Sequence, residues 1–193
     1  MKIAVKILAI ILLATICLTA YGCDKPTDSE VETAYKELYP KAYELAQVIY
    51  GKGLDYEGEV DLDRVDAPHY MPVSADAPYK TKAELEEAVL AVYSESYYND
   101  VLKTVLFGGA ESDENGMFGV SPRYKESSGQ LYVNVKYEQF VMLIPRDYDM
   151  VKVKDVKRSE ATVSVPYNYN GEAKKVETVM VKTEKGWRLD GIV

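Results

Sequence analysis

Residues that build common catalytic sites are scarce in this chain. Its 193 residues include a single histidine, His69, so a zinc site made of several histidines cannot form. The sequence contains no GxxxxGK[ST], GxGxxG, CxxC or GxSxG motif, which leaves nucleotide-binding, redox and serine-hydrolase functions without support. We therefore expect no cofactor, no metal site and no catalytic signature.

Cysteine is almost absent as well, and Cys17 and Cys23 both lie near the N-terminus. Lys2 and Lys6 precede an apolar run, residues 7–20, that is shorter than the roughly 20 residues a membrane-spanning helix needs. A basic start, a short apolar core and small residues after it are typical of a secretory signal peptide. We predict that residues 1–22 are removed and that Cys17 leaves with them, so that no disulfide forms.

The residues around the second cysteine indicate how the protein is held in place. Ala20 and Gly22 precede Cys23, and this pattern resembles the bacterial lipoprotein signal, although leucine is more usual at the position of Ala20. The resemblance implies that Cys23 becomes the mature N-terminus, carries lipid such as palmitate, and anchors the protein to the cell membrane on its extracytoplasmic side. The alternative is an ordinary secreted protein in which Cys23 has no role. Residues 23–30 then form the lipidated N-terminus and a short polar tether.

Positive charge is also in short supply. The chain has 23 Lys and Arg against 31 Asp and Glu, a formal net charge of −8 that becomes more negative once Lys2 and Lys6 leave with the leader. Nucleic acid is an unsuitable partner, because phosphate binding needs a basic surface. There are 17 tyrosines and 3 phenylalanines. Tyrosine suits wet interfaces and half-exposed clefts, or a core whose edges touch water.

Two helical patterns occupy the first half of the predicted domain, residues 31–193. An apolar stripe runs from Val31 to Ile49, with Pro40 expected to kink it or to begin a second segment, and Gly51 to end it. Thr81 and Glu84 form a capping box, and a second stripe continues from there to Gly108 as one long helix. The segment between them, residues 51–80, is mainly a loop in which "HYMPV" at 69–73 could pair as a short strand.

From about Val120 the apolar period changes to two, which indicates strands. Alternating residues run through 131–137 and 161–167, and turns are expected at Asn170-Gly171 and Lys185-Gly186. The terminal "KGWRLDGIV" is predicted to be a last strand with Trp187 and Leu189 on one face. Helices first and an antiparallel meander afterwards predict an α+β fold, with the N-terminal helices packed on one face of a curved antiparallel sheet.

This order of elements resembles the nuclear-transport-factor-2-like or cystatin-like cone. A closer resemblance, over residues 31–193, is to the DL-endopeptidase inhibitor (IseA-like) family of Gram-positive bacteria, carried by "HYMPVSADAPYKTKAELEEAVLAVYSESY" at 69–97. The family resemblance implies an exported protein that binds and restrains hydrolases cutting the peptide crosslinks of the cell wall, with no catalytic residue. The lipoprotein-like Cys23 departs from a simple secreted inhibitor, since lipid would hold this chain at the membrane.

Five residues are candidates for a pocket or an interface: His69, Tyr70, Tyr97, Arg123 and Arg146. Arg123 in "SPR" and Arg146 in "IPRDYD" lie near predicted strand ends beside tyrosines, and Arg and Tyr are favoured interface anchors. They are otherwise ordinary polar residues at strand ends. His69 with one acid is the most economical enzyme hypothesis, against a loop histidine bonded to its neighbours or to solvent. The candidate acids are Asp61, Asp63 and Asp66.

Two acidic stretches partly imitate calcium-binding loops. In "ESDENG", Glu111, Asp113, Asn115 and Gly116 match loop positions one, three, five and six, but Pro122 stands where a bidentate glutamate is needed. In "DLDRVD", residues 61–66, Val65 stands where the next ligand should fall. Solvated acidic turns explain both stretches better than metal sites.

Three functions follow from these patterns. The first is a non-enzymatic lipoprotein of the cell envelope that binds a protein, most specifically a wall-lytic DL-endopeptidase. The second is a small-ligand-binding or catalytic cone whose pocket lies between the long helix and the sheet near His69. A tyrosine-lined cavity with His69 pointing inward would favour the second function, and a filled interior the first. The third is an adhesin-like or sensory role with an unknown partner.

Overall fold

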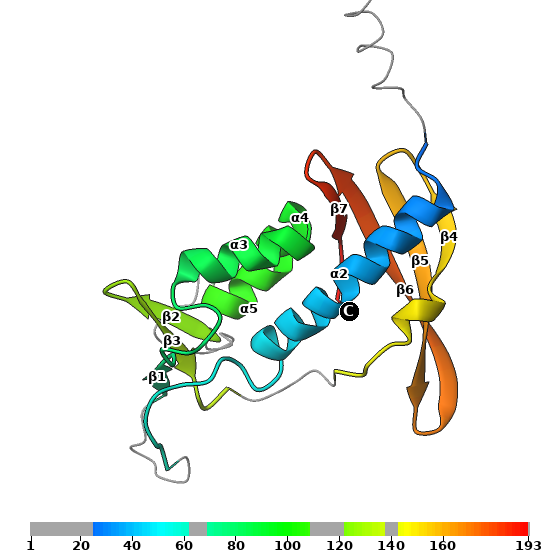
Figure 1. The fold of residues 1–193 in the computed structure, drawn as a ribbon. Helices are drawn as coiled ribbons and strands as arrows, with labels where there is room; N and C mark the ends of the chain where they lie inside the picture. The colour runs from blue at the N-terminus through cyan, green and yellow to red at the C-terminus, as the bar shows by residue number, and fades with distance from the viewer. Residues whose placement is uncertain (1–24, 62–68, 109–121, 138–142, 193) are drawn as a thin grey trace, which may run out of the picture.

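The computed structural model describes residues 25–61, 69–108, 122–137 and 143–192, and Figure 1 shows their arrangement. The class is α+β, as predicted: helices and two antiparallel sheets, with strand orders β1-β3-β2 and β4-β5-β6-β7. The helices are α2 (Asp28–Ile49), α3 (Lys82–Val92), α4 (Glu95–Tyr97) and α5 (Lys103–Phe107), with a π-helical turn at Tyr98–Leu102. The strands are β1 (Tyr70–Pro72), β2 (Tyr124–Ser127), β3 (Gln130–Asn134), β4 (Lys152–Val156), β5 (Glu160–Tyr169), β6 (Glu172–Thr183) and β7 (Gly186–Leu189).

The strands form two separate sheets instead of the single curved sheet that was expected. The "HYMPV" segment does form strand β1, and β1 pairs with β3 through Met71 and Val133. Strand β3 is therefore central in its sheet, with both edges occupied by β1 and β2. The next strand in the chain, β4, belongs to the second sheet. A short 3₁₀ turn at Tyr148–Met150 comes directly before that strand.

Helix α2 begins with a capping box that the sequence analysis did not single out. The Thr27 hydroxyl accepts the Glu30 N–H at 3.2 Å, and the Glu30 carboxylate accepts the Thr27 N–H at 2.7 Å. Pro40 is exposed and the helix continues through it, so the second segment expected there does not form. The proline removes one backbone bond, but eight buried side chains hold this helix in place. They are Val31, Tyr35, Leu38, Tyr39, Ala42, Leu45, Ala46 and Ile49.

The predicted single long helix after Thr81 is wrong. Its capping box is present, but α3 ends at Val92, and Tyr93 and Ser94 adopt extended backbone. The Ser94 N–H donates to the Leu189 carbonyl at 2.8 Å, and the Ser94 hydroxyl accepts the Tyr97 N–H at 3.0 Å to cap α4. The apolar stripe continues past the break because both helices pack on the same core, so the pattern contained no sign of the contact with β7.

The four-stranded sheet follows the sequence pattern closely. Ala161, Val163 and Val165 of β5 are buried and form one face, as predicted. Asn170 and Gly171 form the β5–β6 turn with φ values of 53° and 85°, which suit asparagine and glycine. Residues 184–185 form the β6–β7 turn, and Trp187 and Leu189 are both buried on one face of the last strand.

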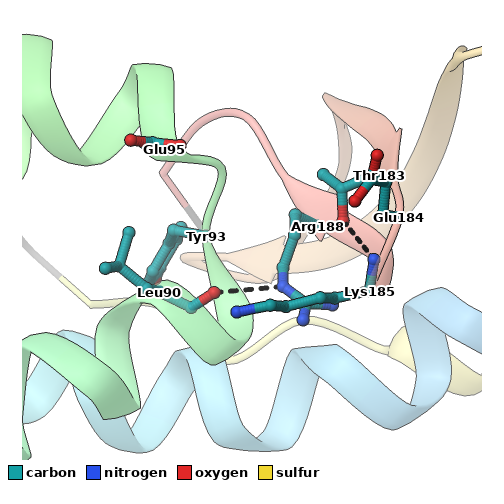
Figure 2. A pocket seen from close by; sticks show the side chains of 7 residues that line it. All are labelled: Leu90, Tyr93, Glu95, Thr183, Glu184, Lys185 and Arg188. Atoms are coloured by element: carbon teal, nitrogen blue, oxygen red, sulfur yellow. Dashed lines mark hydrogen bonds between the residues drawn. The ribbon is translucent and has the colours of Figure 1, made fainter.

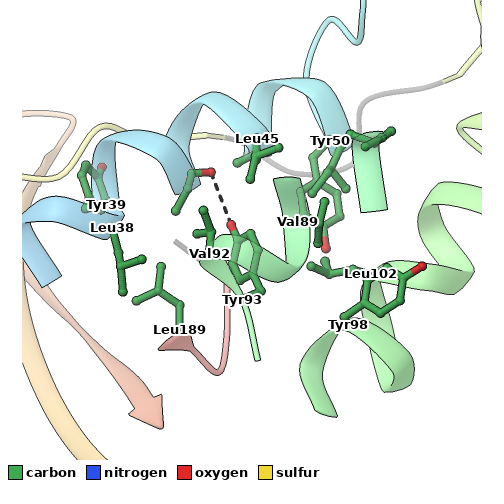
Figure 3. Close-up of a cluster of buried hydrophobic side chains, with 14 of the residues drawn as sticks. Leu38, Tyr39, Leu45, Tyr50, Val89, Val92, Tyr93, Tyr98, Leu102 and Leu189 are labelled. Atoms are coloured by element: carbon green, nitrogen blue, oxygen red, sulfur yellow. Dashed lines mark hydrogen bonds between the residues drawn. The ribbon is translucent and has the colours of Figure 1, made fainter. Parts of the chain in front are cut away.

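Helix α2 contacts both halves of the molecule. In Figure 1 it crosses the four-stranded sheet near its N-terminal end and reaches α3 and the three-stranded sheet at its C-terminal end. Figure 3 shows its side chains meeting those of α3, with the Tyr93 hydroxyl donating to the Ala42 carbonyl at 3.3 Å. In the part of the chain that is described, no helix combines the length and apolarity needed to cross a membrane.

Two neighbouring side chains fasten the C-terminal end of α2 to the smaller sheet. The Tyr124 hydroxyl donates to the Val48 carbonyl at 2.9 Å and accepts the Leu54 N–H at 3.0 Å. Arg123 Nη2 donates to the Gly51 carbonyl at 2.8 Å. The last carbonyls of a helix have no partner within it, so these donors satisfy groups that would otherwise be buried without hydrogen bonds.

Replacing Tyr124 with phenylalanine tests this connection. Tyr124→Phe leaves the buried Leu54 N–H without its acceptor, and we expect the free energy of unfolding to fall by about 1–3 kcal/mol. Urea denaturation measures it. Tyr132→Phe, on half-buried Tyr132 of β3, is the matched control and should change stability by less than about 0.5 kcal/mol. Equal stability of Tyr124→Phe and wild type would contradict the assignment.

Candidate functional site

The described residues place His69 of the enzyme hypothesis and one of its three candidate acids. His69 is exposed just before β1, and its carbonyl accepts the Val135 N–H at 2.9 Å. Asp61 is also exposed, while Asp63 and Asp66 lie outside the described residues. The hollows found on the surface are lined by other residues. Within the described residues, His69 lies on the surface and outside these three hollows, and its pairing with an acid stays a prediction.

Tyr70 and Tyr97 are half-buried and in contact with neighbouring groups. The Tyr70 hydroxyl donates to the Pro122 carbonyl at 2.8 Å, and the Lys125 ammonium lies 4.5 Å from the Tyr70 ring centroid. The Tyr97 ring lies 5.7 Å from the Tyr93 ring. Burial raises the pKa of both Tyr70 and Tyr97. Each side chain therefore joins parts of this chain and presents only part of its surface to solvent.

Arg123 lies at the C-terminal end of α2 and Arg146 lies beside the middle of the helix, at Tyr39, which the strand-end interpretation did not foresee. Arg123 is only 3% exposed, so it cannot be an exposed interface anchor. Arg146 is half-buried, and its Nη1 donates to the Thr178 hydroxyl at 3.0 Å. The Arg146 backbone N–H donates to the Tyr39 hydroxyl at 2.7 Å. Both arginines join α2 to other segments. The Arg123 guanidinium bonds to the Gly51 carbonyl just beyond the helix, whereas Arg146 reaches Tyr39 through its backbone N–H and Thr178 of β6 through its guanidinium.

The calcium interpretation finds no support in the described residues. The "ESDENG" segment, 111–116, lies outside them, as do Asp63 and Asp66 of the other acidic stretch. Among the residues that can be placed, no three His, Cys, Asp or Glu side chains gather as metal ligands. Cys23 also lies outside the described residues, so its lipidation remains a prediction.

The tyrosine excess serves mainly to fill and connect the core. Tyr39 stacks with Tyr35, Tyr43 and Tyr148 at ring-centroid distances of 5.8, 6.1 and 5.0 Å. Hydroxyl groups reach backbone carbonyls across the molecule, as the bonds of Tyr93 and Tyr124 to α2 show. Tyrosine can supply both apolar area and a donor at the edge of a core, whereas phenylalanine cannot supply the donor.

An open groove lies between the end of α3 and the β6–β7 hairpin (Figure 2). Its volume is about 380 Å³. Arg188 Nε donates to the Leu90 carbonyl at 3.1 Å, and the Thr183 hydroxyl donates to the Gly186 carbonyl at 2.8 Å, so that hydroxyl is already used in the turn. Two acids and two bases line the groove without an enclosed centre. The complete lining is Leu90, Tyr93, Glu95, Thr183, Glu184, Lys185 and Arg188.

The larger sheet has a two-stranded extension, residues 165–177, which we call the β5–β6 ribbon. Its base is buried at Val165, and residues 170–175 at its tip are exposed. Strand β4 pairs with β5 only as far as Ser164, and β7 pairs with β6 only from Met180 onward. Beyond those limits β5 and β6 continue to pair with each other up to Tyr169 and Glu172, and the β5 edge there meets only an isolated bridge between Arg146 and Tyr167 among the described residues. Figure 1 shows the ribbon extending past both neighbouring strands.

Several contacts give the β5–β6 ribbon a fixed shape. The Lys174 ammonium lies 4.7 Å from the Tyr169 ring centroid, and Lys174 pairs across the strands with Tyr167. Gly171 N–H donates to the Asn168 side-chain oxygen at 2.9 Å in the turn. Within the described residues, no strand covers the outer edge of β6 from Glu172 to Thr178. The sequence contained the hairpin signal but gave no indication that the hairpin outruns its neighbours.

Comparison with known proteins leaves this description without a family assignment. No protein-family model matches the chain, and no curated protein sequence matches it.

The buried tyrosines predict a specific alkaline transition. Burial raises the pKa of Tyr124 to about 12, and raises that of Tyr35 and Tyr93 as well. The pKa of an unfolded tyrosine is about 10, so stability is complete below pH 10 and is lost as the pH rises through 10 toward 12. We expect tyrosinate absorbance and loss of circular dichroism to rise together above about pH 10. Smooth titration near the ordinary pKa with unchanged dichroism would show that the tyrosines are not buried in this way.

Proposed function

We propose that this chain is a non-enzymatic protein-binding module of the bacterial cell envelope, anchored by lipid on Cys23 and recognising its partner through the β5–β6 ribbon. The observation that carries the proposal is the length of the ribbon. A two-stranded hairpin is marginally stable alone in water. Here the four-stranded sheet supports its base, while its tip is exposed on several sides.

The side chains of the ribbon suit recognition. Tyr167 and Tyr169 are half-buried and present aromatic surface beside exposed Lys174 and Lys175. Tyrosine is enriched at energetically important positions of protein interfaces. Because the turn and the Lys174–Tyr169 contact already fix the shape, binding requires little further ordering of the chain. The free edge of β6 adds backbone donors and acceptors that a partner strand can pair with.

The preferred partner is a wall hydrolase of the DL-endopeptidase class. The residues that support this partner are those of 69–97, which resemble the inhibitor family, and the predicted lipid anchor would hold the module where such hydrolases act. Inhibition needs only a surface that occupies the cleft of the enzyme, and a narrow projecting hairpin is suited to entering one. The filled interior between α2, α3 and the sheet favours this function over a ligand-binding cone near His69.

A binding assay with ribbon variants tests the proposal. The exported chain, purified in mild detergent, is offered to exported wall hydrolases, and digestion of cell walls is followed by turbidity. We expect saturable binding and slowed digestion, and a loss of affinity of roughly 10-fold or more for Tyr167→Ser with Tyr169→Ser.

Tyr132→Ser is the matched control, because Tyr132 is a half-buried strand tyrosine on the other sheet. It should bind as wild type does. Unchanged binding by the folded double variant would remove the ribbon from the proposal, and no binding of any hydrolase by wild type would remove the partner class.

Lipidation makes a separate prediction. Cys23→Ser removes the only cysteine of residues 23–193, and with it the thiol to which the predicted lipid would attach. Each buried CH₂ of an acyl chain contributes about 0.8 kcal/mol to membrane binding, so the variant should move from the membrane fraction to the medium. Detergent phase partitioning and incorporation of labelled palmitate measure this. Wild-type protein that is soluble and unlabelled would refute the anchor.

A further inference from the structure

A second feature, separate from the β5–β6 ribbon, is the environment of the Arg123 guanidinium. Its Nη2 donates to Gly51 and its Nη1 to the Asn134 carbonyl at 3.4 Å, while Nε is buried with no hydrogen-bond partner. The Tyr137 ring lies on the guanidinium, 4.5 Å from its central carbon to the ring centroid. Gly53, with φ of 81°, packs so closely that a Cβ there would collide with Nη2.

The charge of this arginine is incompletely compensated. Within the described segments, none of the salt bridges includes Arg123. The carbonyls at the end of α2 carry partial negative charge and offset part of the burial cost. A full positive charge at 3% exposure is nevertheless expensive without an anion, because desolvation penalises an unpaired buried ion. An anion that reaches the guanidinium would therefore gain a charge-assisted hydrogen bond to a donor already held in place.

The surface beside Arg123 has room for such an anion. A hollow of about 220 Å³ is lined by Arg123, Lys52, Tyr56, Asn134 and Tyr137, together with Gly51, Val133 and Val135. Lys52 pairs with Asp55 at 3.3 Å, but both side chains are largely exposed, so this surface pair is weak. The Lys52 ammonium can therefore turn toward a second anion at low cost. Two cations and two aromatic rings thus surround a space of small-molecule size.

We propose that this hollow binds the carboxylate of a small organic acid or of a peptide C-terminus. The carboxylate would face Arg123 and Lys52, and a short aliphatic group would lie against Tyr56 and Tyr137. A planar guanidinium matches a carboxylate better than it matches a point anion, which is why the carboxylate class is chosen over halide. The site lies at the C-terminal end of α2, whereas the ribbon extends from the sheet that α2 crosses near its N-terminal end, so the two proposals are independent.

Calorimetry with matched ligands tests the proposal on the exported chain in mild detergent. The probes are acetate, N-acetyl-alanine, and N-acetyl-alanine amide, which lacks the charge. We expect at least one of the two carboxylates to bind, with a dissociation constant on the order of 1 mM for so small a ligand. The amide should not bind. Tighter binding of N-acetyl-alanine than of acetate would identify a peptide C-terminus, and equal binding a free acid.

Variants locate the site. Lys52→Gln and Tyr56→Ala change exposed residues and should weaken binding roughly 3-fold to 10-fold while leaving the thermal melt unchanged. Arg123→Gln should abolish binding, and its fold is checked by circular dichroism. Lys41→Gln, an exposed lysine on α2, is the control and should bind as wild type does. The proposal is overturned if neither acetate nor N-acetyl-alanine binds, or if the amide binds as tightly as the carboxylates. Unchanged affinity in both Lys52→Gln and Tyr56→Ala would also overturn it.

Discussion

The C-terminal turn of α2 is held by directional hydrogen bonds, and the position of the smaller sheet depends on them. Along the rest of the helix, apolar side chains pack on β4, β7 and α3, and such packing tolerates small shifts. At the end, Tyr124 and Arg123 bond to three backbone groups within residues 48–54. These bonds fix the angle and register of strand β2 against the helix. The Arg123 guanidinium that bonds to Gly51 also lines the hollow beside it. One buried side chain therefore contributes both to the stability of the fold and to the polarity of that hollow.

Local patterns in the sequence predicted those elements whose formation depends on neighbouring residues. The stripe from Val31 to Ile49, the capping box at Thr81 and the Asn170-Gly171 turn were all recognisable, because capping, periodicity and positive φ are local properties. The break at Ser94 was not, since it depends on a bond to Leu189, which lies far away in the sequence. The division into two sheets was missed for the same reason: nothing near β3 shows that β1 takes its second edge.

The candidate site was less predictable than the fold. Arg123 was identified as important from its proximity to tyrosines, yet its burial could not be read from "SPR", a segment typical of exposed turns. Tyr70 and Tyr97 proved to be half-buried and in contact with other side chains, as the excess of tyrosine over phenylalanine allowed but did not require. The ribbon was visible as a hairpin, but the exposed length of a hairpin is set by where β4 and β7 stop. The exposed length of the ribbon therefore depends on tertiary structure and not on its local sequence.

A protein that acts by recognition should show its contact surface as a local change on binding. Hydrogen–deuterium exchange of the chain, alone and mixed with a wall hydrolase, measures this for every backbone amide at once. We expect slower exchange in residues 165–177, most of all along the free edge of β6, and little change in α2 or the Figure 2 groove. Protection centred on that groove, with the ribbon exchanging as in the free protein, would contradict the claim that the β5–β6 ribbon is the recognition element.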